Sequence, residues 1–252
     1  LALAMGAIDE GHEALATGVR AADIVVLATP VGTVLQQIAE LGALARAGAT
    51  QPGVVVLDLG STKEQVCQAL ATLPDSVEPV GCHPMCGKET SGIEVAEGRL
   101  YQGAPFVITP LPRTRPQTVA LAAALAEAIG AQPIALDPAR HDYLVAAISH
   151  LPYVRAIALF GAVDDVARAD DMVWQLAAGG FRSTTRLAGS DVTMMLDILL
   201  SNQANVLTLI DSLRGRLDGL AGLIRAGDRA GLRFQAEKTR ALRAEFLEKH
   251  GA

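Results

Sequence analysis

The order of apolar segments constrains the fold of this chain more than any other feature of its sequence. In the first half, short runs rich in valine and isoleucine alternate with stretches of helical periodicity. We expect strands at 24–27, 54–57, 77–81, 105–109 and 133–136, and helices at 31–47, 61–73 and 118–129. Such alternation is typical of a parallel sheet covered by helices. The first run is continuously apolar, which predicts a strand buried on both faces.

The second half has a different sequence pattern. After Asp137-Pro138 there is no further β-rich run, and helical patterns extend over about 139–163, 165–178, 190–226 and 228–248. The sequence therefore predicts an α/β domain over 1–138 followed by an all-α domain over 139–252.

Composition excludes several classes of protein. Half of the 252 residues are apolar, which is too many for a disordered chain. The formal net charge of −6 and the lack of a basic, aromatic stripe argue against a general nucleic-acid binder. No uncharged apolar run of ~18 residues is present, so we expect no membrane span. The three cysteines are few and odd in number, which favours a reducing cytoplasm.

Two predicted strand ends carry residues suited to ligand binding. Ala28-Thr29-Pro30-Val31 follows the first strand, and ligands of open α/β sheets lie outside the carboxyl ends of strands. Alternatively, Pro30 only begins a helix. Asp58–Lys63 follows the second strand, where Gly60 permits close backbone approach and Ser61 offers a hydroxyl at a helix N-terminus. Ser61 as N-cap, with Glu64 completing a capping box, explains the same residues without a ligand.

The third strand end is the most specific. Residues 81–92, GCHPMCGKETSG, contain too many glycines for a helix or a strand and predict a shaped loop that presents His83 and Glu89 together. Cys82, His83 and Cys86 are potential metal ligands. A closed site needs four ligands, however, and no second Cys/His pair is nearby, so we expect no metal.

The helical half contains two further candidates. His150 lies in an apolar helical stretch, where a hydrogen-bonded core histidine is the alternative to a functional one. Arg182 and Arg186 lie four residues apart in GGFRSTTR, predicted as a loop between helices, and could bind an anion because arginine matches carboxylates bidentately. The alternative is a loop with solvated arginines.

Taken together, these segments closely resemble the prephenate/arogenate dehydrogenase family of tyrosine biosynthesis. The resemblance extends over essentially the whole chain, in the order GAIDEG (6–11), ADIVVLATPV (22–31), DLGSTK (58–63), GCHPMCGKETSG (81–92), YQGAPFVITP (101–110), DPARHD (137–142), SHLP (149–152) and GGFRSTTRLAGSD (179–191). The histidine loop and SHLP at this spacing in one chain are the most specific part of it.

The resemblance implies a Rossmann-type dinucleotide-binding domain followed by a helical domain that dimerises. It implies NAD or NADP as cofactor and oxidative decarboxylation of prephenate or arogenate, with hydride leaving C4 of the ring and the ring carboxylate leaving as CO2. It also implies a cytoplasmic homodimer with a small-molecule substrate and with no nucleic-acid or membrane partner. The sequence separates neither prephenate from arogenate nor NAD from NADP.

The resemblance also assigns roles to residues. His83 would take the proton of the C4 hydroxyl, and Ser61 would orient that hydroxyl and the nicotinamide. Arg186 would clamp a substrate carboxylate, His150 would face the substrate side chain, and Glu89 would shape the polar pocket. The residues expected to line the nicotinamide and ribose are Ala28, Thr29, Pro30 and Val31, together with Ser61.

The sequence departs from the family pattern in three places. The GxGxxG-bearing strand and helix that should precede GAIDEG are absent, so we expect the printed sequence to begin late by about one βαβ unit of ~30 residues. Ser183 stands where relatives often have an acidic residue, and Met195 stands where some have Trp. Two other functions stay open: a different hydroxy-acid dehydrogenase of the same two-domain type, and a non-catalytic helical dimer or ligand sensor.

Overall fold

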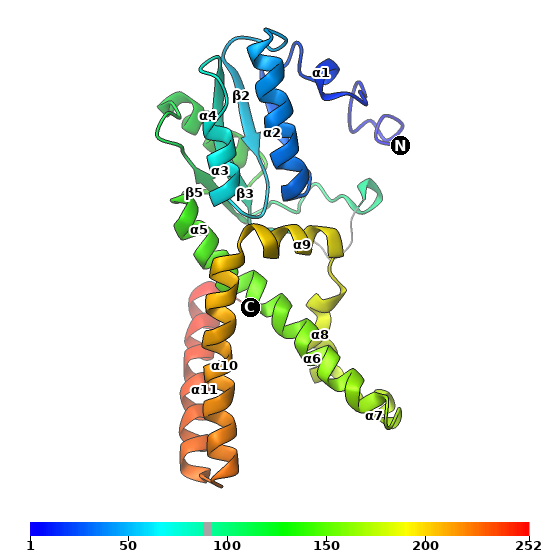
Figure 1. The fold of residues 1–252 in the computed structure, drawn as a ribbon, viewed down its shortest axis with the longest axis vertical. Coiled ribbons are helices and arrows are strands. Elements are labelled where there is room, and N and C mark those ends of the chain that lie inside the picture. The colour runs from blue at the N-terminus through cyan, green and yellow to red at the C-terminus, as the bar shows by residue number, and fades with distance from the viewer. Residues whose placement is uncertain (88–91, 252) are drawn as a thin grey trace. The chain divides into compact units, whose positions relative to one another are not determined.

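The computed structural model describes residues 1–87 and 92–251 of the chain, in two compact units, Leu1–Val206 and Leu207–Ala252 (Figure 1). The strands are β1 (Ile24–Leu27), β2 (Val54–Asp58), β3 (Val77–Pro84), β4 (Pro105–Thr109) and β5 (Gln132–Ala135). The helices are α1 (Leu15–Gly18), α2 (Val31–Arg46), α3 (Glu64–Ala71), α4 (Pro116–Ala128), α5 (Pro138–Val145), α6 (Leu151–Ala167), α7 (Met172–Leu176), α8 (Gly179–Thr185), α9 (Val192–Ser201), α10 (Gln203–Arg225) and α11 (Arg229–His250). The domain boundary expected at residue 138 stays a prediction.

The five strands form one sheet in the order β1-β2-β3-β4-β5. β1, β2 and β3 are parallel, as are β4 and β5, but β3 and β4 pair antiparallel. The expectation of an entirely parallel sheet is therefore wrong at one pairing. A parallel pair needs a crossover, usually a helix, and the described part of the β3–β4 connection contains only a short 3₁₀ turn at Ile93–Val95.

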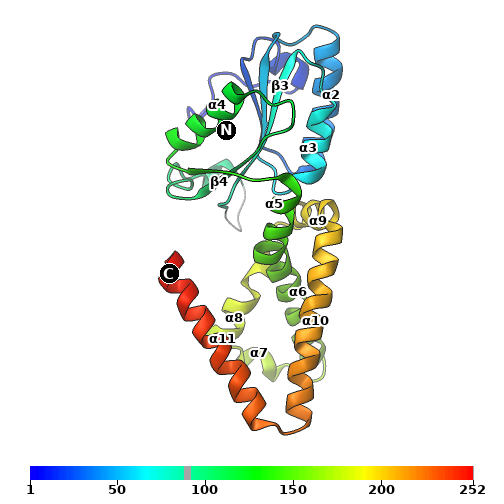
Figure 2. The same ribbon diagram turned by 90° about the vertical axis from the view of Figure 1, so that its left-hand side faces the viewer.

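Helices cover the two faces of the sheet unequally. α2 and α3 pack on one face, where Val34, Ile38 and Leu70 are fully buried against Val56 of β2. α4 packs on the other face against β3 and β4 (Figure 2). β1 lies at the edge of the sheet, and Ile24 and Val26 are 36% and 50% exposed. The prediction that β1 is buried on both faces is thus wrong, because the packed helices α2 and α3 bury only its other face.

Residues Pro138–Ala167 form one continuous helix that joins the sheet to the helical half. It consists of α5, a π-helical turn at Ala146–His150, and α6. By length and mean hydropathy (1.5) it is one helix in the described chain that could cross a membrane. Its residues His141, Asp142 and His150 are buried polar side chains hydrogen-bonded within the protein.

Two expected features of the helical half are wrong. The pattern over 190–226 predicts one helix, but α9 ends at Ser201 and α10 begins at Gln203, because Asn202, between them, turns its side chain to the backbone of Asp142. The glycine-rich segment at 179–185 forms helix α8 instead of a loop. There the hydroxyls of Thr184 and Thr185 donate to carbonyls one turn back, which lets these residues fit inside a helix.

The second unit is a helical hairpin built from α10 and α11. Gly227, at φ +63°, makes the turn, and the Asp228 carboxylate caps α11 by accepting from the Gly231 amide at 2.9 Å. Figure 2 shows the two helices diverging from this turn, and a groove of about 1290 Å³ lies between them. Large apolar side chains are exposed on the hairpin, among them Leu217, Ile224, Phe234, Leu242 and Phe246.

Gly81 of β3 lies where the sheet packs closely against helix α3. A Cβ at this position would overlap Thr109 Oγ1 and lie 2.7 Å from Cys67 Sγ of α3. We expect Gly81→Ala to lower the free energy of unfolding by about 1–3 kcal/mol, because the core cannot absorb a methyl group there. Urea unfolding measures the change. Gly215→Ala is the control, since nothing lies within 4 Å of its Cβ position. Equal stability of the two variants would contradict this packing.

Candidate active site

The carboxyl ends of the three parallel strands lie side by side. Leu27 of β1 is paired with Asp58 of β2, which is paired with Gly81 of β3. The Leu59 amide also donates to the Leu27 carbonyl at 2.8 Å, which holds the first two ends together. The three segments singled out in the sequence therefore follow the carboxyl ends of neighbouring strands, which is where open α/β sheets bind ligands.

The segment after β1 is partly open to solvent. Ala28 and Pro30 are exposed, Thr29 is half-buried with its hydroxyl donating to Gln37 Oε1, and Val31 is buried as the first residue of α2. Beyond it, the Gly32 amide donates to the Asp197 carboxylate of α9 at 2.8 Å. A helix of the second half thus caps the N-terminus of α2.

A buried ion pair organises the turn after β2. Asp58 and Lys63 are completely buried, and the Lys63 ammonium donates to Asp58 Oδ2. The same carboxylate accepts from the Gly60 amide at 2.9 Å and the Cys82 amide at 3.0 Å. Burial raises the pKa of Asp58, and the Lys63 cation together with these donors opposes the rise. The pair therefore joins the β2–α3 turn to β3, one residue before His83.

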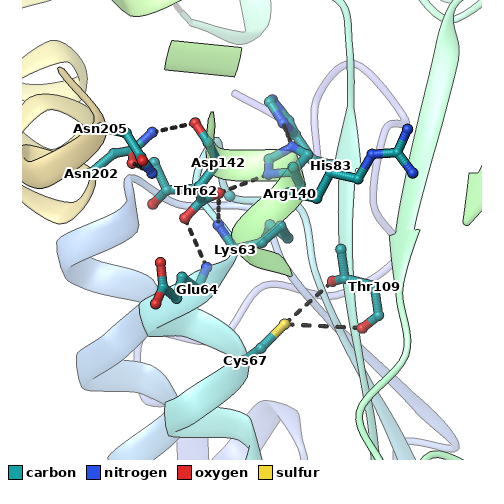
Figure 3. A network of polar contacts seen from close by, with 12 residues as sticks. Thr62, Lys63, Glu64, Cys67, His83, Thr109, Arg140, Asp142, Asn202 and Asn205 are labelled. Atoms are coloured by element: carbon teal, nitrogen blue, oxygen red, sulfur yellow. Dashed lines mark hydrogen bonds and ion pairs between the residues drawn. The ribbon is translucent and has the colours of Figure 1, made fainter. Parts of the chain in front are cut away.

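Asp142 caps helix α3 from a distant part of the chain. Its Oδ1 accepts from the Lys63 amide at 2.6 Å and its Oδ2 from the Glu64 amide at 2.8 Å (Figure 3). The expected capping box of Ser61 and Glu64 is therefore wrong: α3 begins at Glu64, and a carboxylate of α5 supplies its N-terminal acceptors. Ser61 is half-buried in the preceding turn, and its hydroxyl does not cap α3.

His83 is connected to Asp142 through His141. His83 Nδ1 lies 2.9 Å from His141 Nε2, and His141 Nδ1 lies 2.7 Å from Asp142 Oδ1. His83 belongs to β3, paired with Val107, so the expectation that the loop begins at Gly81 is wrong by four residues. Burial, followed by the Lys63 cation and by His141 and His150, holds the pKa of His83 well below its ordinary 6.5. His83 is therefore neutral at physiological pH.

His150 lies in the same region and is fully buried. The Asn202 side-chain amide is 3.3 Å from His150 Nδ1 and 2.7 Å from the Asp142 carbonyl. Burial lowers the pKa of His150 to about 4, although Asp142 opposes the change. A neutral imidazole that accepts from Asn202 must carry its proton on Nε2.

A second contact joins the β2–α3 turn to the helical half. Thr62 Oγ1 and Ser201 Oγ, at the end of α9, lie 2.8 Å apart. It adds to the two bonds of Asp142, the bond of Asp197 and the contact of His141 with His83, which also join helices α5 and α9 to this end of the sheet. The site is thus made from both halves of the first unit.

The remaining predicted residues are placed less closely. Arg186 is exposed at the first position of a 3₁₀ helix, Arg186–Gly189, directly after α8, which carries Arg182. Glu89 lies outside the described residues. Among the residues described, no group of three or more His, Cys, Asp or Glu side chains could hold a metal ion. Burial raises the pKa of the Cys82 thiol, an unfavourable setting for a thiolate ligand.

Sequence reasoning missed the residues that hold this site together. Asp58, Lys63, His141, Asp142 and Asn202 received no role, although the first four lie in the motifs DLGSTK and DPARHD. Charged and imidazole side chains inside an apolar helical stretch were the available signal, because such groups are buried only when they are paired. Asp58 and Lys63 are only five positions apart and His141 is next to Asp142, but their more distant partners lie between 24 and 79 positions away, which one sequence does not reveal.

Comparison with known proteins places both halves of the chain. Residues 1–135 match the model for the nucleotide-binding domain of prephenate dehydrogenase, and residues 137–236 match the model for its dimerization domain. The Rossmann-type fold with a helical second half is thereby confirmed.

Individual relatives agree with these matches. Prephenate dehydrogenase of Bacillus subtilis is 33% identical over 94% of this chain, which spans 63% of that protein's length. The structure of prephenate dehydrogenase from A. aeolicus, solved with hydroxyphenyl propionate and NAD+, has a TM-score of 0.89 at 30% identity and covers 97% of this chain and 84% of its own. Synechocystis arogenate dehydrogenase has a TM-score of 0.79 at 29% identity, with 97% of this chain and 86% of its own covered. With both domains matched in order, the chain belongs to the prephenate dehydrogenase family.

Proposed function

We propose that this chain carries the catalytic residues of an NAD(P)-dependent dehydrogenase that oxidatively decarboxylates prephenate or arogenate. The observation that carries the proposal is the placement of His83. It is a neutral imidazole at the carboxyl edge of a Rossmann-type sheet, next to the turn that bears Ser61. A neutral histidine can accept a proton there, and open α/β sheets bind nucleotides outside the carboxyl ends of their strands.

The residues present fit the nicotinamide end of the nucleotide. Ala28 and Pro30 are exposed and Thr29 is half-buried, so small side chains and backbone line the edge where the ring would lie. Ser61 offers a hydroxyl beside them. No GxGxxG motif occurs in the printed sequence, so the described residues support binding of the nicotinamide and ribose but assign no pyrophosphate cradle.

The chemistry divides between the nucleotide and the side chains. Bound NAD(P)+ would take the hydride from C4 of the substrate ring. The His83 imidazole accepts the C4 hydroxyl proton as the carbonyl forms, and returns a proton to that oxygen when the ring carboxylate leaves as CO2 and the ring becomes aromatic. Ser61 orients the hydroxyl. Arg186 clamps a substrate carboxylate, and His150 faces the substrate side chain.

The exposed apolar hairpin supports a homodimer. Residues 137–236 match a dimerization domain, and the diverging helices α10 and α11 leave Leu242 57% exposed beside their groove. Exposed apolar surface of this kind marks protein–protein interfaces. A cytoplasmic location is part of the proposal, supported by three cysteines that are all free.

An assay of the full-length protein tests the proposed activity. Prephenate and arogenate are each incubated with NAD+ and with NADP+, and NAD(P)H and CO2 are measured together. Stoichiometric formation of both from at least one pair supports the proposal. Oxidation of another hydroxy acid without CO2 release, or a complete lack of nucleotide binding by calorimetry, overturns it in favour of a different dehydrogenase or a non-catalytic dimer.

Replacing His83 tests its role as proton acceptor. We expect His83→Asn to lower kcat by about 10²-fold or more while KM stays nearly unchanged, because asparagine fills the space but cannot take a proton. Steady-state kinetics measure both constants. His12→Asn is the control, since His12 lies on the surface, 3.4 Å from the Glu10 carboxylate, and should leave kcat unchanged. Turnover by His83→Asn near that of the control would remove His83 from the chemistry.

The depressed pKa of His83 predicts the shape of the pH profile. The base works only when neutral, so activity is lost as pH falls through its pKa. Because burial, Lys63, His141 and His150 all lower that pKa below 6.5, we expect kcat/KM to stay level from pH 8 to 6.5 and to fall only at lower pH. Circular dichroism at each pH confirms that the protein stays folded. An acidic limb centred at or above pH 6.5 would contradict this environment.

The hairpin predicts a specific effect on assembly. We expect Leu242→Asp to convert the dimer to monomer at micromolar concentration, because a charge would be buried in an apolar interface. Arg229→Glu, at the exposed start of the same helix, is the control and should stay dimeric. Light scattering after size exclusion measures the mass. A monomeric wild-type protein, or a dimeric Leu242→Asp variant, would refute this surface as the interface.

A further inference from the structure

Three side chains form a hydrogen-bonded line that ends at the proposed base. Asp142 Oδ1 lies 2.7 Å from His141 Nδ1, and His141 Nε2 lies 2.9 Å from His83 Nδ1. Asp142 is completely buried and His141 is 1% exposed, while the ring of His83 is half-buried at the strand edge. The two imidazole rings meet edge to face, with a 5.1 Å centroid separation. Nothing in the proposed reaction requires His141 or Asp142 to touch the substrate.

The direction of this line follows from what each atom can donate. An ionised carboxylate only accepts hydrogen bonds, so His141 Nδ1 must carry a proton to bond Asp142. A neutral His141 then has a bare Nε2, which can only accept. His83 Nδ1 must therefore carry a proton, which leaves the lone pair of its neutral ring on Nε2.

The contacts of Asp142 argue against the reverse direction. It would require Asp142 to be protonated and to donate to His141. Both of its oxygens, however, already accept from backbone N–H groups, Oδ1 from Lys63 and Oδ2 from Glu64. Those amides can only donate, so both oxygens act as acceptors at the start of the helix, as an ionised carboxylate does. The start of α3 thus keeps Asp142 as an acceptor.

We propose that His141 and Asp142 are positioning residues that hold His83 in its Nδ1–H form, so that Nε2 is the atom that accepts the substrate proton. This rests on the proposed role of His83 as proton acceptor. When Nε2 takes the hydroxyl proton, His83 becomes an imidazolium whose Nδ1–H still donates to His141. The positive charge stays on His83, and no proton needs to move to Asp142.

The same carboxylate also sets the position of Ser61. By capping Lys63 and Glu64, Asp142 fixes where α3 begins and hence where the preceding turn lies. The hydroxyl that orients the substrate and the imidazole that deprotonates it are therefore placed by one group. A shift of Asp142 would move both together.

Nitrogen NMR of histidine-labelled protein tests the proposal directly, because ¹⁵N shifts distinguish Nδ1–H from Nε2–H imidazoles. The chain has five histidines, and His83→Asn identifies the His83 signals by their loss. We expect His83 to be Nδ1–H in the wild-type protein at pH 7.5. In His141→Phe, which keeps a ring but cannot accept, we expect the Nε2–H form to appear.

Kinetics of paired variants complete the test. We expect His141→Phe to lower kcat by about 10- to 100-fold with KM within about threefold. We expect His141→Gln to recover most of that loss, because its amide oxygen can accept from His83 Nδ1. The proposal is overturned if wild-type His83 is Nε2–H, or if His141→Phe changes neither tautomer nor kcat. A loss of kcat without a change of tautomer also overturns it, since it indicates a merely structural role.

The two proposals fail in distinguishable ways. If the wild-type protein oxidises neither prephenate nor arogenate, the proposed function fails, yet the NMR result still reports the tautomer of His83. If His141→Phe does not fold, the wild-type spectrum alone decides, because an Nε2–H ring at His83 is incompatible with the hydrogen-bonded line.

Discussion

The carboxylate of Asp142 accepts three hydrogen bonds that join separate parts of the fold. Two come from the backbone amides of Lys63 and Glu64 at the start of α3, and the third comes from the neighbouring ring of His141. A buried carboxylate is costly unless donors replace its water. At the same time, the first amides of a helix need acceptors that the helix cannot supply. The two amides therefore supply the donors that the buried carboxylate needs, and the carboxylate supplies the acceptors that the amides need. These bonds fix the first helical turn after β2 relative to α5.

This arrangement connects the fold to its chemistry. The Asp58–Lys63 pair ties the turn after β2 to Cys82, and the line from Asp142 reaches His83 in the next position of β3. Burial and the nearby cation keep that imidazole uncharged, which a proton acceptor requires. The helical half contributes directly through Asn202, whose side chain reaches both Asp142 and His150. Residues of both the α/β half and the helical half therefore form the site.

Much of the fold follows from sequence patterns, since all five strands and the long helices lie close to their expected positions. The errors occur where distant side chains override local signals. Ser61 has the pattern of an N-cap, but Asp142 supplies the acceptors instead, so α3 starts at Glu64. The break between α9 and α10 at Asn202 has neither Gly nor Pro as a local sequence signal, because its cause is a hydrogen bond to a residue 60 positions away. His83 and His150 could be proposed from motifs, whereas the roles of Lys63 and His141 depend on partners that only the folded chain brings together.

Amide hydrogen exchange at Lys63 and Glu64 is the most direct test of whether the Asp142 carboxylate holds the start of α3. First-turn amides without an acceptor exchange rapidly, as expected for Gln117 in α4, whose N-terminus has no side-chain cap. We expect Lys63 and Glu64 to exchange slower than Gln117 by a factor on the order of 10² or more in the wild-type protein. We also expect Asp142→Ala to remove this protection. Exchange at Lys63 and Glu64 as fast as at Gln117 in the wild-type protein would contradict this role of the Asp142 carboxylate.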